Sequence, residues 1–401
     1  MATMVPFNDL RPRFEADAAV YRSAIDRVFA RGWYVLGPEV EAFEVEFAEY
    51  LGINHAVGVA NGTDAIELAL RAGGIGRGDE VITVAHTAVA TACGIERSGA
   101  TPIFVDIRPD DYCIDPKAIP AAVTSRTRAI IAVHLYGQPA RLKELREIAD
   151  RLGLLLIEDC AQAHGARFDG RLVGTFGHLA AFSFYPTKNL GAFGDGGAVV
   201  TNDSAMAGRL RRLRNYGQTD RYRHEDAGGF NSRLDEIQAA LLRVSLRRLD
   251  SDIAQRQRLA DRYLGRLRTP ALPCSAPGTD HAYHLFVVRL QNRDGFRDEM
   301  HHRGIETLVH YPIPVHLQPA FAHLQGQMGD LPESERAARE VVSLPLFVGM
   351  TNEQQDTVIV AANSAAITER GLSSEVQPAF SPFPLREGSR GVRPALAEAS
   401  T

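Results

Sequence analysis

Residues 128–159 read RAIIAVHLYGQPARLKELREIADRLGLLLIED, and this stretch decides the fold class. The runs Arg128–His134 and Leu154–Glu158 are short and rich in aliphatic residues, a composition typical of strands that are buried on both faces. Between them, residues 141–152 repeat apolar side chains at the spacing of an amphipathic helix. A strand, a helix and a second strand in this order predict two strands of a buried, mostly parallel sheet.

The same alternation of strands and helical patterns covers roughly residues 50–220. Residues 38–51 form a further amphipathic pattern, in which Pro38 takes the first helical position. The predicted fold class is therefore α/β, with a large domain that contains a mostly parallel seven-stranded sheet. The expected strands are Ala56–Ala60, Glu80–Val84, Pro102–Asp106, Arg128–His134, Leu154–Glu158, Ala180–Phe184 and Gly197–Thr201.

Beyond the sheet, the pattern predicts a second, smaller domain. A long helical pattern from Leu234 to Leu267 links the two parts, and mixed strands and helices follow it, as in an α+β domain. We place the large domain, with its N-terminal helical segment, at residues 1–250 and the smaller C-terminal domain at residues 251–370. The elements expected in the smaller domain are the strands His284–Leu290 and Glu306–His310 and the helices Gly295–Arg303, Glu333–Val342 and Asn352–Thr368.

Composition and charge exclude several classes of protein. The 401 residues carry 44 basic and 49 acidic side chains, a net charge of −5 that gives no support to a nucleic-acid partner. The longest apolar runs, such as Leu152–Ile157, are far shorter than the ~18 residues that span a membrane. Residues 371–401 hold 12 Gly, Pro or Ser, so we expect them to form a disordered tail.

Cysteine and histidine usage points away from disulfide and metal sites. The four cysteines lie far apart without a CxxC pair, and none of the 13 histidines shows metal-ligand spacing. The N-terminal residues include no apolar stretch of the kind that directs secretion. We therefore expect a cytoplasmic protein with no metal centre and no membrane partner.

Residues Asn61-Gly62-Thr63-Asp64 lie between an expected strand and an expected helix. Gly62 allows the backbone to approach an anion closely, and Thr63 adds a hydroxyl. Free amides and the helix dipole at such a position favour a phosphate group. An ordinary helix cap at Asn61 or Thr63 is the alternative, and for this segment alone it is the commoner case.

Asp159 follows the apolar strand Leu154–Glu158, at the edge where open α/β sheets bind ligands. Beside a cationic ring nitrogen its carboxylate stays ionised and keeps that nitrogen protonated. A helix cap for the chain from Ala161 onward is the alternative. Gln162 and His164 extend the same loop toward the same edge.

Residues 182–191 read FSFYPTKNLG and place Lys188 after another apolar strand. Near a phosphate and a cationic ring, the charged form of this lysine is disfavoured, which leaves a nucleophilic amine; a lysine that extends into solvent is the alternative. Ser183 supplies a second hydroxyl to the anion site. A phosphate site, an acid for a pyridinium nitrogen and an amine for a Schiff base are the groups that pyridoxal 5'-phosphate (PLP) requires.

The chain also carries eight blocks in order: GPEVEAFEVEFAEYLG, VANGTDAIELAL, HLYGQPA, IEDCAQAHGA, FSFYPTKNLGAFGDGGAVVT, LRNYG, FNSRLDEIQAALL and HYPIPVHLQ. These blocks resemble those of the DegT/DnrJ/StrS-type nucleotide-sugar aminotransferases, a group of fold-type-I PLP enzymes. The resemblance covers about residues 5–370. It implies a PLP-dependent aminotransferase that forms a homodimer with shared active sites.

Roles for individual residues follow from this resemblance. Lys188 is implied as the catalytic residue, which forms the Schiff base with PLP and later moves the proton of the substrate. Asp159 is implied to pair with the pyridinium nitrogen, and Gln162 to lie near the ring hydroxyl. The residues implied to hold the cofactor phosphate are Gly62, Thr63, Ser183 and, across the dimer, the partner's Asn231.

The substrate side of the site is implied by the same resemblance. Many relatives carry an aromatic residue at the position of Ala88, and here we expect His86 to cover the cofactor ring instead, with a different cover as the alternative. Arg233 is a candidate partner for a carboxylate or phosphate, with an ordinary surface or interface arginine as the alternative. The residues implied near the substrate are Tyr185, Asn189, Tyr216, Arg233, His310 and Tyr311.

Two segments bear on the sugar substrate. Relatives that act at C3 of a keto sugar tend to show Tyr-Pro-x-Lys and a downstream His-Tyr-Pro, whereas relatives that act at C4 more often show His-Ala-x-Lys. This chain has Tyr185-Pro-Thr-Lys188 and His310-Tyr311-Pro312. We therefore expect L-glutamate as the amino donor and a nucleotide-linked 3-keto-6-deoxyhexose, bound to dTDP, as the acceptor. A 4-keto-sugar aminotransferase, a PLP-dependent sugar dehydratase and a non-catalytic regulator are the alternatives.

Overall fold

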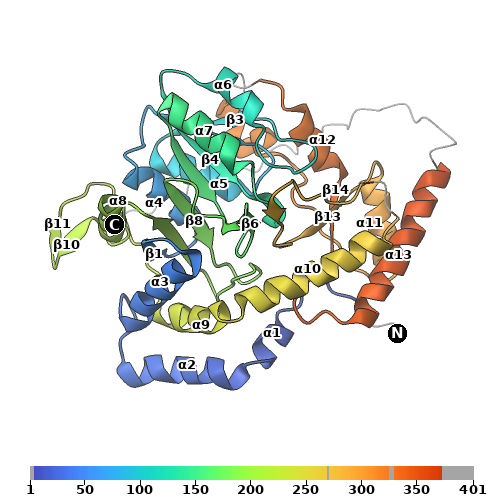
Figure 1. Cartoon of the computed structure of the whole chain (residues 1–401), viewed down its shortest axis with the longest axis horizontal. Coiled ribbons are helices and arrows are strands. Elements are labelled where there is room, and N and C mark those ends of the chain that lie inside the picture. Colours follow the sequence, from blue (N-terminus) through green and yellow to red (C-terminus); the bar gives the residue numbers. More distant parts are fainter. Residues whose placement is uncertain (1–3, 269–270, 325–328, 373–401) are drawn as a thin grey trace, which may run out of the picture.

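A computed structural model describes residues 4–268, 271–324 and 329–372, and the structural statements below concern these residues. At its centre lies a seven-stranded sheet in the order β1-β9-β8-β5-β4-β2-β3 (Figure 1). The predicted α/β class and the number of strands in this sheet are confirmed. The strands are β1 (His55–Val59), β2 (Glu80–Val84), β3 (Thr101–Val105), β4 (Thr127–Val133), β5 (Leu155–Asp159), β8 (Leu179–Ser183) and β9 (Gly197–Thr201).

All strands of this sheet run in one direction except β9, which is antiparallel to both of its neighbours. Consecutive residues of β8 point to opposite faces, so Leu179 and Ala181 enter one hydrophobic core while Ala180 and Phe182 enter the other. Strands buried on both faces need continuous apolar runs, which explains why the sequence predicts their positions well. The carboxyl ends of the parallel strands meet at one edge of the sheet, the usual ligand-binding edge of open α/β folds.

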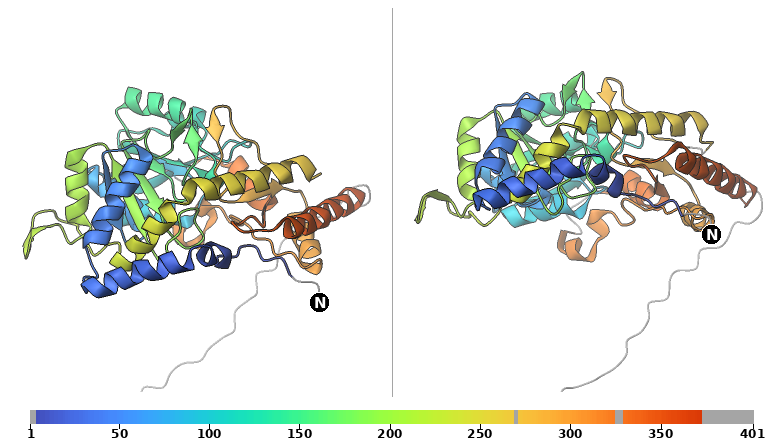
Figure 2. Two further views of the ribbon diagram at one scale, coloured as in Figure 1. Left: turned by 60° about the horizontal axis from the view of Figure 1, so that its bottom comes forward. Right: turned by 90° about the horizontal axis from the view of Figure 1, so that it is seen from below.

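Helices cover both faces of the sheet (Figures 1 and 2). Helix α4 (Gly62–Ala72) begins after Asn61, whose side-chain oxygen accepts a hydrogen bond from the Asp64 amide at 2.8 Å. Helix α7 (Leu142–Leu152) ends at Gly153, whose left-handed φ of 65° suits a glycine. The other helices around the sheet are α3 (Pro38–Leu51), α5 (Val89–Ser98), α6 (Ile119–Ala122), α8 (Ser204–Leu213) and α9 (Glu236–Leu246).

The single long helix predicted from Leu234 to Leu267 is wrong, because the structure has two helices there, α9 and α10 (Leu249–Arg266). Leu246, near the end of α9, and Leu249, at the start of α10, are buried in the same hydrophobic core. The apolar period therefore continues across the break, and the sequence pattern does not reveal it.

Residues 279–324 and 329–372 form a smaller α+β arrangement around the antiparallel pair β13 (Phe286–Arg289) and β14 (Val341–Leu344). The helix expected to reach Val342 stops at Glu340, because the next four residues are buried as β14. The strand expected at Glu306–His310 is also wrong, since this stretch forms only the single bridge Leu308–Ser343. The helices of this part are α11 (Arg293–His302), α12 (Pro332–Glu340) and α13 (Asn352–Leu372).

The predicted tail begins two residues too early. Gly371 and Leu372, expected in the tail, are the last residues of α13, and residues 373–401 lie outside the described residues. The domain boundary expected between residues 250 and 251 stays a prediction. The remaining α-helices and strands are α1 (Arg11–Glu15), α2 (Ala18–Arg31), β6 (Arg167–Phe168), β7 (Arg171–Leu172), β12 (Thr279–Asp280) and the hairpin β10 (Gln218–Asp220) to β11 (Arg223–His224), which projects from the body in Figure 1. Short 3₁₀ helices lie at Pro116–Ala118, Leu135–Gly137, Val315–Leu317 and Pro319–Leu324.

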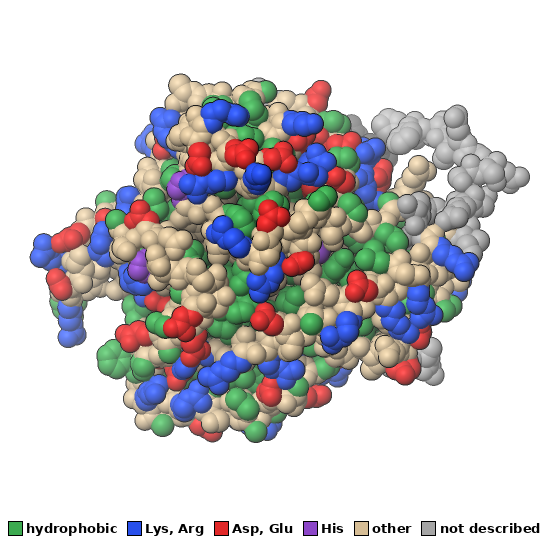
Figure 3. All heavy atoms as spheres, viewed as in Figure 1, with side chains coloured by type: hydrophobic (Ala, Val, Ile, Leu, Met, Phe, Trp, Pro, Cys, Tyr) green, Lys and Arg blue, Asp and Glu red, His purple; other side chains and the backbone are tan. Residues whose placement is uncertain are grey.

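The distribution of charge on the surface and the state of the cysteines can be read from the structure. On the face drawn in Figure 3, basic and acidic side chains are interspersed rather than gathered by sign. None of the helices in the described ranges is long and apolar enough to cross a membrane. All four cysteines, Cys93, Cys113, Cys160 and Cys274, are free thiols.

Candidate active site

A cavity of about 580 Å³ lies at the carboxyl edge of the sheet. Three of its wall residues, Val133, Asp159 and Ser183, are the last residues of β4, β5 and β8. Other parts of the wall come from the start of α4 and from the C-terminal part of the chain. The predicted site residues on this wall are Gly62, Thr63, Asp159, Gln162, Ser183, Tyr185, Lys188, His310 and Tyr311.

The start of α4 presents free backbone amides in this wall. The side chain of Asn61 occupies the Asp64 amide, and the Gly62 and Thr63 amides before it have no hydrogen-bond partner within the described residues. A Cβ atom on Gly62 would lie 2.6 Å from Cβ of Ser183, so only glycine allows the serine hydroxyl so close to the helix end. The alternative, a helix cap at Asn61, is thus present, and the next two residues leave free amides of the kind that suit a phosphate. The phosphate role itself stays a prediction.

Asp159 provides a buried carboxylate in the same cavity. Its Oδ2 accepts a hydrogen bond from the Thr91 hydroxyl at 2.9 Å, and its Oδ1 accepts one from the Ala161 amide at 3.1 Å. Burial raises the pKa of Asp159, while these two hydrogen bonds and the charge of Lys188 act to lower it. The carboxylate is thus fixed in direction by two donors, and a cationic partner placed against it would favour its charged form.

Lys188 is half-buried in the wall, and its amine is electrostatically coupled to Asp159. Burial lowers the pKa of Lys188 from 10.5 to about 8, although the Asp159 carboxylate acts in the opposite direction. A lysine with such a pKa has a substantial neutral fraction near neutral to mildly alkaline pH. The neutral amine is the form that attacks a carbonyl group or accepts a proton.

Gln162, Tyr311 and His310 form the side of the cavity that faces the C-terminal part. The Gln162 amide nitrogen donates to the Tyr311 hydroxyl at 2.9 Å, and His310 Nδ1 lies 2.9 Å from the Ser343 hydroxyl. Burial and the nearby Lys188 charge lower the pKa of His310 to about 4, so its imidazole is neutral at physiological pH. These groups are neutral donors and acceptors, which suit a polyhydroxylated ligand.

Two predicted site residues are not on the cavity wall. The side chain of His86 is completely buried and lies 2.8 Å from the Tyr136 hydroxyl through Nε2. The expectation that His86 covers the cofactor ring is therefore wrong, because its side chain turns into the core and Ala88 itself lines the cavity. Asn189 is also buried, and its amide nitrogen donates to the Ala282 carbonyl at 3.1 Å.

Three further predicted residues lie together, away from this wall. Arg233 donates to the Asn215 side chain at 3.0 Å, and its guanidinium lies 5.9 Å from the centre of the Tyr216 ring. Asn231 forms a backbone bridge with Asn215. Tyr216 and Asn231 are both exposed. Within one chain, these residues are a surface group rather than part of the cavity.

Several further residues on the wall carry little signal in the sequence. Thr91 lies in the first turn of α5, and its only signal is a hydroxyl close after a strand end. Arg97, at the end of α5, pairs with Asp64 and Glu67 of α4 at 2.9 Å each. His284 lines the cavity, and its Nδ1 has no hydrogen-bond partner within the described residues. The positions of Thr91 and Arg97 depend on the packing of α5 against α4, and that of His284 on the loop before β13, neither of which single-sequence patterns report.

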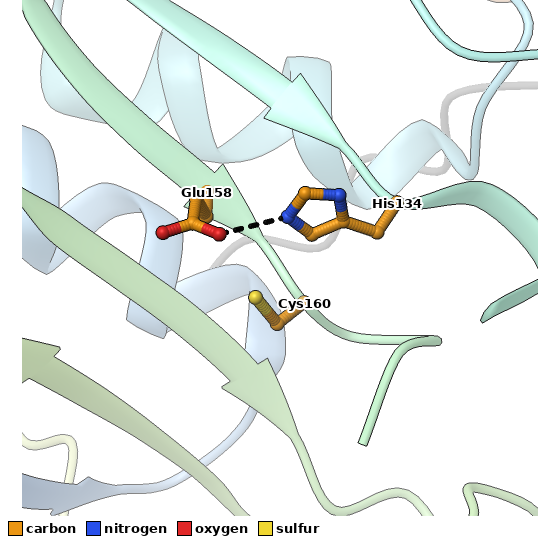
Figure 4. A group of neighbouring side chains, drawn as sticks. All are labelled: His134, Glu158 and Cys160. Atoms are coloured by element: carbon orange, nitrogen blue, oxygen red, sulfur yellow. Dashed lines mark hydrogen bonds and ion pairs between the residues drawn. The ribbon is translucent and has the colours of Figure 1, made fainter. Parts of the chain in front are cut away.

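A buried cluster of His134, Glu158 and Cys160, next in sequence to the wall residues Val133 and Asp159, has the residue types of a metal site (Figure 4). His134 Nε2 lies 3.1 Å from Glu158, whose carboxylate also accepts three backbone amides, from residues 174, 176 and 177. The other ring nitrogen of His134 accepts the Ala140 amide at 2.9 Å. Burial would raise the pKa of Glu158, but these hydrogen bonds outweigh it and lower that pKa. The carboxylate and the ring thus have protein partners and act as a structural hydrogen-bond centre.

Comparison with known proteins decides the family. Residues 17–363 match the model of the DegT/DnrJ/EryC1/StrS aminotransferase family. The chain belongs to this family. A dTDP-3-amino-3,4,6-trideoxy-alpha-D-glucose transaminase of Streptomyces venezuelae is 52% identical over 365 residues, which are 90% of this chain and 96% of the relative.

Solved structures of the family agree. The structure of DesV from S. venezuelae, in complex with a ketimine intermediate, has a TM-score of 0.89 at 51% identity and covers 91% of this chain and 99% of that chain. NtdA from Bacillus subtilis, solved with bound cofactor PMP, has a TM-score of 0.82 at 31% identity and covers 87% and 82%. This DegT/DnrJ-type chain is therefore an aminotransferase with the type I fold, and PLP is its cofactor.

The cavity fits this cofactor. An anion site at Gly62 and Ser183, a hydrogen-bonded carboxylate at Asp159 and an amine of lowered pKa at Lys188 share one wall. These are the three groups that a phosphate, a pyridinium nitrogen and an aldehyde need.

Proposed function

We propose that the protein transfers the amino group of L-glutamate to C3 of a dTDP-linked 3-keto-6-deoxyhexose and so forms a 3-amino sugar. The observation that carries the reaction type is the joint placement of Lys188, Asp159 and the Gly62–Ser183 anion site on one cavity wall. The choice of substrate is supported by the S. venezuelae relative, which is named for a dTDP-3-amino sugar. The Tyr185-Pro-Thr-Lys188 segment agrees with that choice.

When bound, PLP supplies an electron-accepting ring that stabilises negative charge on the carbon next to the amino group. Lys188 supplies the amine that removes the proton from this carbon and returns it, because its pKa of about 8 gives it a usable neutral form. Asp159, held by Thr91 and the Ala161 amide, is the carboxylate that would keep the ring nitrogen protonated. Gly62, Thr63 and Ser183 would hold the phosphate.

The sugar is proposed to contact the side of the cavity formed by Tyr185, His310 and Tyr311. Tyr185 is 53% exposed and lines the cavity, so its ring is available to a ligand. His310 is neutral, and Tyr311 is held in place by Gln162. Neutral hydrogen-bonding groups beside an aromatic ring are a common way of binding sugar hydroxyls and the apolar face of the ring.

The amino position can be tested with the two isomeric products. In the reverse direction, an amino sugar converts the PLP form of the enzyme to the PMP form. This conversion removes the yellow absorbance band of the PLP form. We expect dTDP-3-amino-3,6-dideoxyhexose, and not the corresponding 4-amino isomer, to cause this change together with release of the keto sugar. A faster reaction with the 4-amino isomer would assign the enzyme to C4 instead.

We also propose that the enzyme is a homodimer in which the partner's Asn231 reaches the cofactor phosphate. In support, Asn231 is exposed and lies off the cavity wall of its own chain. An apolar stretch, Trp33-Tyr34-Val35, lies beside this segment, with Trp33 60% exposed and Val35 paired with Asp235. Exposed aromatic residues next to a functional polar group are typical of an interface.

Mixing two inactive variants tests the shared site. Lys188→Ala and Asn231→Asp should each lose activity as pure proteins, the second because its added charge repels the phosphate. After unfolding and refolding as a mixture, random pairing gives mixed dimers in which one of two sites has both native residues, so about a quarter of wild-type activity should return. No recovery would show that Asn231 acts within its own chain, and an Asn231→Asp variant that stays active as a pure protein would show that Asn231 has no role.

Gly62→Ala tests the anion site. The new Cβ would lie 2.6 Å from Ser183 Cβ, so the serine or the helix start must shift. We expect the PLP dissociation constant to rise by about tenfold or more, as for overpacked sites in general. Gly265→Ala is the matched control, because a Cβ at Gly265 has no neighbour within 4 Å. Equal PLP affinity of both variants, measured by fluorescence titration, would contradict the assignment.

A further inference from the structure

The chain at residues 310–314, here called the wall segment, borders the cavity without belonging to a helix or strand. Its first two residues, His310 and Tyr311, line the cavity. A segment without regular hydrogen bonds of its own keeps its position only through contacts with the rest of the fold. The contacts that hold this segment therefore decide the shape of one side of the cavity.

Tyr136 and His86 form one of these contacts. The Tyr136 hydroxyl donates to the carbonyl of His310, and its oxygen lies 2.8 Å from His86 Nε2. Because the hydroxyl has one proton and gives it to the carbonyl, His86 Nε2 must carry a proton and donate it to Tyr136. Burial lowers the pKa of His86 to about 3, so the ring stays neutral in this arrangement.

Tyr136 is also fixed through its backbone. Its φ of 61° lies in the left-handed region, which is unfavourable for a tyrosine. The Tyr136 amide donates to the Gln162 side-chain oxygen at 2.7 Å, and the nitrogen of the same side chain donates to the Tyr311 hydroxyl at 2.9 Å. A strained residue persists where surrounding contacts require its conformation. Here the Tyr136 hydroxyl contacts the wall segment at His310, and Gln162, bound to the Tyr136 amide, contacts it at Tyr311.

Ala85, the residue after β2, holds the chain directly after the wall segment as well. The Val315 amide donates to the Ala85 carbonyl at 2.9 Å. Ala85 directly precedes His86. Ala85 thus fixes the chain just past the segment, at Val315, and His86 acts on its other end, at His310, through Tyr136. His86 has no contact with the cavity, and its visible function is to orient the Tyr136 hydroxyl.

We propose that His86 is a positioning residue, which acts through the Tyr136 hydroxyl to hold the wall segment and thereby sets the affinity of the enzyme for its sugar substrate. This inference rests on the proposed function for the identity of that substrate. L-Glutamate is much smaller than a nucleotide sugar and does not need the whole side of the cavity. Loss of the hydrogen bond between His86 and Tyr136 should therefore weaken the reaction with the amino sugar much more than the reaction with L-glutamate.

The half-reactions of the PLP-loaded enzyme test this separation. We expect Tyr136→Phe and His86→Leu to raise the concentration of dTDP-3-amino-3,6-dideoxyhexose needed for half-maximal conversion by about tenfold, the effect of a lost hydrogen bond. The rate with L-glutamate should stay within about twofold of wild type. His86→Gln, whose amide can donate in place of Nε2, should restore sugar affinity. Equal losses with both donors, or unchanged sugar affinity in His86→Leu, would overturn the proposal.

Hydrogen exchange gives a readout that does not depend on turnover. Amides of the wall segment should exchange faster in Tyr136→Phe and His86→Leu than in wild type, and should be restored in His86→Gln. Tyr112→Phe is the matched control, because its ring packs on Tyr136 at 5.5 Å without joining these hydrogen bonds. Unchanged exchange in the first two variants would refute the positioning role. A wild type that reacts with glutamate but not with the amino sugar would refute only the proposed substrate.

Discussion

Lys188→Ala is expected to reduce amino transfer by ~10⁴-fold or more, because the variant loses both the amine that links to PLP and the base that moves the substrate proton. Lys188 is suited to both tasks since burial lowers its pKa to about 8. The anion site and Asp159 remain, so the variant should still bind PLP without a covalent link. Steady-state rates and an absorbance titration with PLP measure the two effects separately.

The chain has few lysines, so few other sites could form the link to PLP. The chain has three lysines, Lys117, Lys143 and Lys188, and the first two are exposed. Borohydride reduction of the PLP-loaded enzyme should attach the cofactor to the Lys188 peptide, and Lys117→Ala should behave as wild type. Attachment to either exposed lysine, or a rate for Lys188→Ala within about a hundredfold of wild type, would reject the assignment.

Asp159→Asn is expected to reduce the rate of amino transfer by ~10³-fold, in the range found when one fixed electrostatic partner is removed from a buried site. The substitution keeps the shape of the side chain but removes the charge that keeps the cofactor ring nitrogen protonated. The anion site is unaffected, so PLP should still bind. Because asparagine cannot accept from both Thr91 and the Ala161 amide through equivalent oxygens, the orientation is weakened as well.

Thr91→Val separates charge from orientation at the same position. It removes the hydroxyl that donates to Asp159 at 2.9 Å and leaves the carboxylate in place. We expect a loss of about tenfold, far smaller than that of Asp159→Asn. A rate for Asp159→Asn close to that of Thr91→Val would mean that the charge of Asp159 is not used.

The sheet was predictable because its chemistry leaves a simple signal. Strands β4 and β5 are mostly buried and contain the aliphatic runs 129–133 and 155–157. The elements of the C-terminal part are harder to predict from the sequence, because its sheet has only two strands and β14 follows helix α12 without an intervening loop. Periodicity alone cannot show where the helix stops and the strand begins.

The site was predictable where it coincides with strand ends. Asp159 and Ser183 end parallel strands, and topology brings such residues to one edge. His86 follows a strand as well, but its side chain turns into the core, and no pattern in the sequence reports that direction. Thr91 and Arg97 reach the wall through the packing of α5 on α4, which the sequence also leaves open. The role of Asn231 across a dimer stays a prediction.

The most direct test of the account is the absorbance spectrum of the PLP-loaded enzyme before and after addition of L-glutamate. The account predicts a yellow band from the link to Lys188, which glutamate removes with release of 2-oxoglutarate. Lys188→Ala should lack both the band and its response. A yellow wild-type enzyme whose spectrum glutamate leaves unchanged would contradict glutamate as the amino donor, and a wild-type enzyme that forms no band with PLP would contradict the central assignment.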